Sequence, residues 1–370
     1  MPGAGYDTAE KRWAGVGPYY AMFPVGFANE VITTYTKVGD LVLDPFAGRA
    51  TAIYSAAVHG RIGFGIELNP VGWVYGKAKL SPARQEDVEK RLQEISREAD
   101  DFTTQAEQLP PFFHYCFSKN VRRFLSAARV LLSWRYSPTD WTLMALLLVY
   151  LHGKRNESLS NQMRQTKSMA PDYAIRWWKQ KGMMPPEVKP FDFMLQRIKW
   201  RYSKGVPAIN GSQVYLGDCC EVLPLLKQKI HKSGGKNISL LFTSPPYFGV
   251  TNYHYDQWIR LWLLGFSPEP KSSLGYCRER FNQPLEYKTI LLGAFLKSYQ
   301  LLSKDSVIYV RTDSRPFTLQ TTLEVLRQAF PDKSMKMIER PSPKTTQTHL
   351  FGDRTPKMGE VDLILRPTNK

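Results

Sequence analysis

Short runs of aliphatic and β-branched residues, each followed by a segment with helical periodicity, constrain the fold of this chain more than any other feature. The runs occupy residues 41–44, 62–67, 214–216, 239–243, 307–311 and 361–365. Parallel strands need a crossover connection, usually a helix, so strands that alternate with helices indicate a parallel sheet. We therefore expect an α/β fold with a Rossmann-like, mostly parallel sheet.

A basic segment with a different residue pattern interrupts this alternation. Residues 111–210 contain 17 Lys and Arg against 5 Asp and Glu, and they show helical periodicity over residues 121–134, 141–151 and 173–181. Breaks at Ser81-Pro82 and around Gly205-Val206-Pro207 are typical of domain borders. We expect residues 1–80 and 206–370 to form the Rossmann-like domain, and residues 81–205 to form an inserted, basic and mainly helical subdomain.

The composition narrows the classes of partner. A formal charge of +17 indicates a polyanionic partner, because each phosphate that Lys or Arg neutralises releases condensed counterions. No stretch approaches the roughly 18 apolar residues of a membrane span, and residues 1–20 lack the pattern of a secretory signal. The cysteines, at positions 116, 219, 220 and 277, lack zinc-site spacing. We expect a cytoplasmic protein without a membrane partner, a structural metal or disulfides.

The segment from residue 41 to residue 51 has the sequence of a nucleotide-binding strand, turn and helix. Leu41-Val-Leu-Asp44 is an apolar strand that runs into a small-residue turn containing Gly48, and a helix begins near Thr51. Glycine at such a turn permits positive φ and lets a ligand approach the backbone. A second strand ends in Glu67, whose carboxylate can accept hydrogen bonds from both ribose hydroxyls of a nucleoside. Together these residues predict a nucleoside cofactor.

A second apolar strand ends abruptly at Ser244-Pro245-Pro246-Tyr247. Proline has no N–H, so the nearby carbonyls are not committed to strand pairing and can face a ligand. An exocyclic base amine needs such acceptors for its two protons, because its lone pair is otherwise delocalised into the ring. The Ser244 hydroxyl and the Pro245 carbonyl can accept them, while Tyr247 can stack on the base. Cytosine carbon-5 chemistry would need a nucleophilic cysteine, typically after proline, and no cysteine here follows proline.

The sequences DPFAGRAT at 44–51 and TSPPY at 243–247 resemble the amino-methyltransferase family of DNA-modifying enzymes, whose motifs read roughly DPFxGxGT and (D/N/S)PP(Y/F/W). Ala50 stands where the family usually has glycine. The resemblance covers residues 19–80 and 212–370, and it implies a class I methyltransferase fold, S-adenosylmethionine as cofactor and double-stranded DNA as substrate. It also leaves open a partner from a restriction or defence system, and it places the protein in a prokaryotic cytosol on nucleoid DNA.

The resemblance assigns roles to individual residues. Asp44 and Gly48 would line the methionine moiety, and Asp218 would meet the adenine amino group, unless Asp218 serves as a helix N-cap. The full set expected at the cofactor is Phe23, Pro24, Asp44, Pro45, Phe46, Gly48, Thr51, Glu67, Asp218 and Thr243, with Phe23-Pro24 closing over it. The catalytic set is Ser244, Pro245, Pro246 and Tyr247. Serine before PPY usually accompanies cytosine N4 methylation in the family, although exceptions leave adenine N6 open.

Polar residues of the basic segment are candidates for DNA contact. Guanidinium, ammonium and carboxamide groups bind phosphates and read base edges; the candidates are Lys154, Arg155, Asn161, Gln162, Arg164 and Lys167. Two other functions remain open, an RNA amino-methyltransferase with the same catalytic chemistry and a non-catalytic DNA-binding module. An RNA enzyme would be expected to carry a recognisable RNA-binding domain, and a degenerate fold to lose its acids or the PPY motif.

Overall fold

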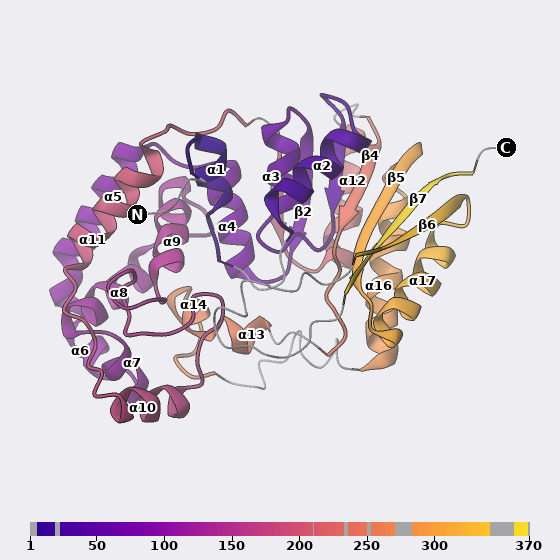
Figure 1. Cartoon of the computed structure of the whole chain (residues 1–370). Helices are drawn as coiled ribbons and strands as arrows, with labels where there is room; N and C mark the ends of the chain where they lie inside the picture. Colours follow the sequence, from indigo (N-terminus) through magenta and orange to yellow (C-terminus); the bar gives the residue numbers. More distant parts are fainter. Residues whose placement is uncertain are drawn as a thin grey trace. The chain divides into compact units, whose positions relative to one another are not determined.

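A computed structural model describes residues 6–18, 23–209, 211–232, 236–249, 253–270, 283–340 and 359–368. The chain forms two compact units. The helical unit contains Met1–Met22, Pro70–Ile209 and Tyr253–Leu274, and the sheet unit contains Phe23–Asn69, Asn210–Asn252 and Gly275–Lys370. Figure 1 shows the elements of both units.

The sheet unit is built on seven strands in the order β3-β2-β1-β4-β5-β7-β6. Their bounds are β1 Leu41–Asp44, β2 Ile62–Glu67, β3 Gln213–Leu216, β4 Ile238–Thr243, β5 Leu302–Asp313, β6 Lys333–Arg340 and β7 Glu360–Pro367. The first five pair in parallel, and β7 runs antiparallel to both β5 and β6. The predicted Rossmann-like, mostly parallel α/β sheet is therefore confirmed.

Helices cover both faces of this sheet. α2 (Val25–Tyr35) and α3 (Thr51–Val58) pack on one face, against β1, β4 and β5. α12 (Cys219–Lys232), α16 (Pro284–Tyr299) and α17 (Pro316–Ala329) pack on the other. The central strands are apolar because both of their faces are buried.

The direction of strand addition reverses between β1 and β4. From β1 the chain adds β2 and then β3 on one side, and β4 followed by β5 on the other. In open α/β sheets, ligands bind outside the carboxyl ends of the strands at such a reversal. The carboxyl ends of β1 and β4 are therefore where a ligand site is expected.

The described part of the helical unit contains helices and one isolated β-bridge, between Gly153 and Gln162. Its helices are α1 Ala9–Ala14, α4 Pro70–Leu80, α5 Gln85–Glu98, α6 Thr103–Glu107, α7 Pro111–Cys116, α8 Lys119–Leu131, α9 Pro138–Tyr150, α10 Pro171–Gln180, α11 Pro190–Tyr202, α13 Tyr253–Asp256 and α14 Trp258–Leu263, with a 3₁₀ turn at Ala99–Phe102. Helices α8, α9 and α10 correspond to the three periodic segments expected there. Among the described helices, none is both long enough and apolar enough to cross a membrane.

The borders between the units differ from the expected 81–205 insert. Helix α4 was expected with the sheet, but it belongs to the helical unit because its apolar residues pack all round against α9 and α14. Tyr253–Leu274 join the same unit although they lie between β4 and β5 of the sheet in sequence. There α14 inserts Trp258 and Trp262 beside Phe113 of α7, and Arg129 of α8 donates to the Trp262 carbonyl at 2.8 Å.

Candidate functional site

Polar side chains gather along the carboxyl edge of the parallel sheet. Asp44 ends β1 and Glu67 ends β2, while Asp218 follows β3 and Ser244 follows β4. Because β3, β2, β1 and β4 are consecutive neighbours about 5 Å apart, these residues form a row along one edge. Four chain segments distant in sequence are thus brought together within the sheet unit.

Asp44 is almost completely buried, with 2% of its surface exposed. Its Oδ1 accepts a hydrogen bond from Thr243 Oγ1 at 2.6 Å and one from the Phe46 N–H at 3.1 Å. Burial raises the pKa of Asp44 to about 7, although both hydrogen bonds act in the opposite direction. Both of these donors are neutral, so a cationic ligand would stabilise the ionised carboxylate.

Glu67 holds the turn that follows β1. Its Oε2 accepts from the Gly48 N–H at 2.6 Å, and its Oε1 accepts from the Asn69 N–H at 2.7 Å. Each carboxylate oxygen has a further lone pair, which suits the ribose hydroxyls expected here. Burial raises the pKa of Glu67 to about 8, opposed by these bonds. The Glu67 side chain retains some exposed surface, whereas Asp44 is almost completely buried.

The turn between β1 and α3 places two residues in the left-handed region. Gly48 has φ 54° and Ala50 has φ 60°. The Ala47 N–H donates to the Ile66 carbonyl at 2.9 Å, which holds the turn against β2. Ala50 therefore adopts a left-handed backbone conformation that glycine would adopt at lower energy.

Gly48→Ala is expected to lower the free energy of unfolding by about 1–2 kcal/mol, because a Cβ at positive φ is strained. Ala50→Gly is the matched control in the same turn. Relief of strain there is offset by the greater entropy of glycine in the unfolded chain and by loss of a buried methyl group, so its stability should stay within about 1 kcal/mol of wild type. Urea denaturation of both variants measures the difference. Equal destabilisation by both substitutions would contradict this account of the turn.

Asp218 caps helix α12, as its alternative interpretation predicted. Its Oδ1 accepts from the Cys220 N–H at 2.8 Å, and its carbonyl accepts from the N–H groups of Glu221 and Val222 at 3.0 Å each. A cap uses one carboxylate oxygen, so a contact with an adenine amine stays a prediction. Within the described residues, the Asp218, Cys219 and Cys220 side chains bring three potential metal-ligand atoms within 4.8 Å of one another, a grouping that CxxC spacing does not reveal.

The other expected cofactor residues lie around the same strand ends with different exposures. Phe23 is 9% exposed and stacks on Phe242 of β4, with ring centroids 4.6 Å apart and planes 12° apart. It supports β4 from within the core, whereas Pro24 is exposed. The closure of Phe23-Pro24 over a cofactor stays a prediction. Pro45 and Thr51 are buried, and Phe46 is partly buried against the cluster that includes Phe295.

The Ser244–Tyr247 segment leaves β4 next to Asp44. Ser244 Oγ donates to Tyr247 Oη at 3.3 Å, which is long for a hydroxyl pair and therefore readily exchanged for another partner. Burial raises the pKa of the Tyr247 phenol above its usual range, and negative charge on Glu360 raises it further. The phenol is therefore neutral at physiological pH, and its ring offers an uncharged stacking surface.

Charged residues that the sequence did not single out lie around Tyr247. The carboxylates of Glu360 and Asp313 raise its pKa, and Arg311 lowers it. Arg311 makes a two-bond ion pair with buried Asp362 on the neighbouring strand, at 2.6 and 2.9 Å. The strand expected at residues 307–311 continues to Asp313, so a longer predicted strand would have placed Asp313 at a strand end. No local sequence pattern indicates that Glu360 lies near Tyr247.

The six candidates for DNA contact lie in the loop after α9, and they differ in accessibility. Lys154, Arg155 and Arg164 are exposed, while Gln162 and Lys167 are partly buried. Lys154 pairs with Glu157 at 3.8 Å and Lys167 with Asp256 at 3.0 Å. The Gln162 side chain accepts from the Arg155 N–H at 2.9 Å.

Asn161 corrects the expectation for that loop. It has no exposed surface, and its amide donates to the carbonyls of Tyr115 and Met183 at 3.1 and 3.2 Å. A carboxamide in this position satisfies the backbone of α7 and of the segment after α10, so it shapes the loop and does not face a ligand.

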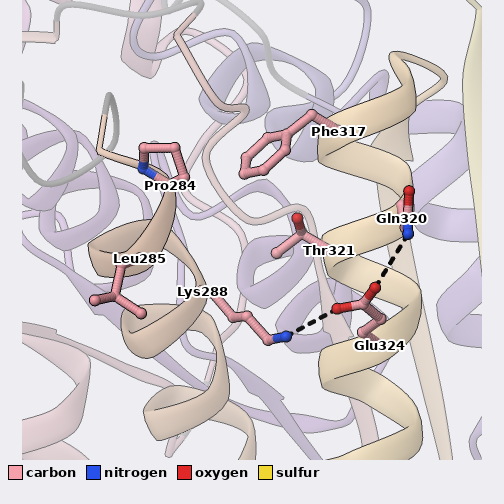
Figure 2. A pocket seen from close by; sticks show the side chains of 7 residues that line it. All are labelled: Pro284, Leu285, Lys288, Phe317, Gln320, Thr321 and Glu324. Atoms are coloured by element: carbon pink, nitrogen blue, oxygen red, sulfur yellow. Dashed lines mark hydrogen bonds and ion pairs between the residues drawn. The ribbon is translucent and has the colours of Figure 1, made fainter.

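An open groove lies between α16 and α17, as Figure 2 shows. It is lined by Pro284, Leu285, Lys288, Phe317, Gln320, Thr321 and Glu324. Glu324 accepts from Lys288 Nζ at 2.8 Å and from Gln320 Nε2 at 3.2 Å. These lining residues include none of the expected cofactor or catalytic residues.

Comparisons with known proteins agree with the expected class of enzyme. A family model described as a DNA methylase, of the N6/N4 type, matches residues 4–71, which contain the first strand, the turn and Glu67 but not residues 243–247. No curated protein matches the chain. Thus the partial match supports a methyltransferase, and it leaves the target atom open.

Solved structures of methyltransferases are similar at low identity. The rRNA methyltransferase aviRa from Streptomyces viridochromogenes has a TM-score of 0.35 and 11% identity over 98% of this chain and 96% of that chain. A structure from Streptococcus mutans described as a SAM-dependent methyltransferase has a TM-score of 0.34 and 9% identity over 92% of this chain and 48% of that chain.

Proposed function

We propose that this chain is an S-adenosylmethionine-dependent DNA methyltransferase that modifies an exocyclic base amine, with cytosine N4 as its target. The observation that carries the proposal is the 2.6 Å hydrogen bond from Thr243 to Asp44. It joins the cofactor strand end to the catalytic strand end at the point where strand addition reverses. A methyl donor bound at β1 and a base bound at β4 would then meet.

The carboxylates fit the proposed cofactor. Asp44 Oδ1 carries both of its neutral donors, so we assign Oδ2 to the methionine ammonium. The oxygens of Glu67 accept the ribose hydroxyls, and Asp218 accepts the adenine amine. S-adenosylmethionine supplies an electrophilic sulfonium methyl. The turn around Gly48 lets the ligand approach the backbone closely.

The catalytic residues act by positioning and by hydrogen bonding. Ser244 Oγ turns from Tyr247 to accept one amine proton, and the Pro245 carbonyl accepts the other. Both bonds would localise the nitrogen lone pair for in-line attack on the methyl carbon. The C–S bond of the sulfonium would break as the N–C bond forms, S-adenosylhomocysteine would leave, and one amine proton would pass to water. The neutral Tyr247 ring stacks on the base, which must leave the duplex to reach the strand end.

Serine at position 244 favours cytosine N4 over adenine N6. A hydroxyl can donate as well as accept, which suits the acceptor nitrogen beside the cytosine amine. Adenine has a similar ring nitrogen, so adenine N6 is the alternative target. Mass spectrometry of nucleosides from DNA of an expressing host tests the choice: we expect N4-methylcytosine. N6-methyladenine alone would overturn the base assignment, and 5-methylcytosine would contradict the mechanism.

The loop after α9 is proposed to bind DNA phosphates. The Trp178 indole of α10 donates to the Gln162 carbonyl at 2.8 Å, so the loop is fixed against α10. α10, which contacts the loop through Trp178, also exposes the basic and aromatic side chains of Tyr173, Arg176 and Lys179.

Replacing Arg155 and Arg164 together by alanine is expected to weaken DNA binding and to flatten its salt dependence by up to about two units of slope, about one for each lost phosphate contact. The double replacement of Lys90 and Arg97 on α5, both exposed, removes the same charge and serves as control. Binding to duplex DNA is measured by anisotropy at several salt concentrations. An equal change of slope in both double variants would mean that net charge, and not this loop, determines the affinity.

A further inference from the structure

Tyr287 of α16 contacts the proposed catalytic segment, Ser244–Tyr247. Its hydroxyl donates to the Pro246 carbonyl at 3.1 Å, and the side chain has no exposed surface. A buried phenol normally needs a partner for its hydroxyl, and here that partner is a main-chain atom of the proposed catalytic segment. No sequence pattern indicates this contact, since 41 positions separate the two residues.

The segment needs an external tether because of its own composition. Pro245 and Pro246 have no N–H groups, so neither can hold the turn by donating a backbone hydrogen bond. Proline fixes φ but leaves ψ adjustable. Because ψ sets the direction of the carbonyl, a hydrogen bond that holds the Pro246 carbonyl also holds ψ at that residue. The same peptide unit sets the position of the Tyr247 backbone. A hydrogen bond that fixes the Pro246 carbonyl therefore fixes the position of the Tyr247 Cα, from which the ring extends.

An aromatic frame holds Tyr287 itself in place. Its ring lies 5.5 Å from Phe248, the residue after Tyr247, and 6.2 Å from Phe317 of α17. Phe248 and Phe317 are in contact as well, with centroids 4.4 Å apart. Phe317 also lines the groove of Figure 2. The three rings connect α16 and α17 to the chain that leaves the catalytic segment, so the hydroxyl has little freedom to move away from Pro246.

We propose that Tyr287 is a positioning residue, whose hydroxyl fixes the Pro246 carbonyl and thereby the stacking position of Tyr247 and the direction of the Pro245 acceptor. The role in catalysis rests on the function proposed above. Tyr287 does not touch the substrate. It acts through the backbone of the segment that does.

Tyr287→Phe removes the hydroxyl and keeps the ring. With unmethylated plasmid DNA and radiolabelled S-adenosylmethionine, we expect kcat to fall about ten- to hundred-fold, the scale of a small misplacement of reacting groups. The KM for DNA and the affinity for S-adenosylhomocysteine, measured by calorimetry, should stay within about twofold of wild type, since binding contacts are unchanged. Tyr299→Phe, on the same helix but 39% exposed, is the matched control and should retain wild-type kcat.

Amide hydrogen exchange tests the tether without any substrate. The amides of Tyr247, Phe248 and Gly249 should exchange several-fold faster in Tyr287→Phe than in Tyr299→Phe, because the peptide after Pro246 is then free to rotate. Wild-type kcat or unchanged exchange in Tyr287→Phe would overturn the proposal. If wild-type protein transferred no methyl group to DNA, the proposed function would fail, while the exchange measurement would still decide whether Tyr287 holds the segment.

Discussion

Asp44→Asn is expected to weaken S-adenosylmethionine binding about ten- to hundred-fold, which corresponds to the roughly 1.5–3 kcal/mol of a hydrogen bond to a charged group. Asparagine keeps the shape of the side chain, and its carbonyl oxygen can still accept from Thr243. The loss would therefore come from the missing negative charge at Oδ2, which we assign to the methionine ammonium.

The affinity of the wild-type protein should rise with pH. Burial raises the pKa of Asp44 to about 7, so only about one-tenth of the free protein has this carboxylate ionised at pH 6. If the ligand binds the ionised form, the apparent affinity at pH 6 is about tenfold lower than at pH 8. Glu67, with a pKa raised to about 8, adds in the same direction. Asp44→Asn should lose the part of this dependence that belongs to Asp44.

The stability of the free protein should fall as pH rises, whereas its affinity for the ligand should rise. In the unfolded chain both carboxyls ionise near pH 4, whereas in the folded protein they keep their protons to about pH 7 and about pH 8. The folded state binds more protons between these values, so the contribution of these groups to stability is present below about pH 4 and is lost as pH rises through 7 and 8. Ligand binding should reverse the trend, which thermal melts with and without S-adenosylhomocysteine measure.

Asp40→Asn is the control for these measurements. Asp40 precedes β1 at its amino end, where its carboxylate accepts from the Lys37 N–H at 2.7 Å, so it should change neither the affinity nor its pH dependence. Wild-type affinity in a folded Asp44→Asn variant would remove Asp44 from the cofactor site.

The central strands could be predicted from sequence, and the edge strand could not. Residues 41–44 and 62–67 are apolar runs because both faces of β1 and β2 are covered, and their bounds match the expected ones. β6 (Lys333–Arg340) escaped prediction because its alternating residues are mostly exposed and charged, as befits a sheet edge. β6 is a strand because it pairs with β7, and this pairing cannot be read from the local sequence.

The division into units depends on contacts distant in sequence. The Ser81-Pro82 break marks the end of α4, but whether α4 packs on the sheet or on helices is decided by α9 and α14, some 60 to 190 positions away. The candidate site divides in the same way. Sequence motifs indicated Asp44, Glu67 and Ser244. The contact of Tyr287 with Pro246 depends on the three-dimensional fold, so the sequence did not indicate it. Asn161 is the opposite case: its place in a basic loop predicted a DNA contact, whereas its buried side chain hydrogen-bonds to the protein backbone and holds the loop in shape.

Ser244→Ala is expected to lower kcat about 10²- to 10³-fold with cofactor binding retained, because it removes an acceptor that strengthens as positive charge develops on the amine. Tyr247→Ala should lower transfer about 10²-fold by removing the stacking surface that fixes the base in line with the methyl group. Calorimetry with S-adenosylhomocysteine and methyl transfer to DNA measure both effects in the same preparations.

Tyr247→Phe separates the ring of Tyr247 from its hydroxyl. Burial keeps the phenol protonated, and its 3.3 Å contact with Ser244 is weak, so the hydroxyl has no required part in proton transfer. The phenylalanine variant should therefore stay within about tenfold of wild-type kcat, since its ring still stacks and Ser244 is released to accept the amine proton. Its rate should also follow pH as the wild type does. If Tyr247→Phe were as inactive as Tyr247→Ala, the hydroxyl would have to act on the substrate directly, and the stacking role assigned to Tyr247 would be wrong.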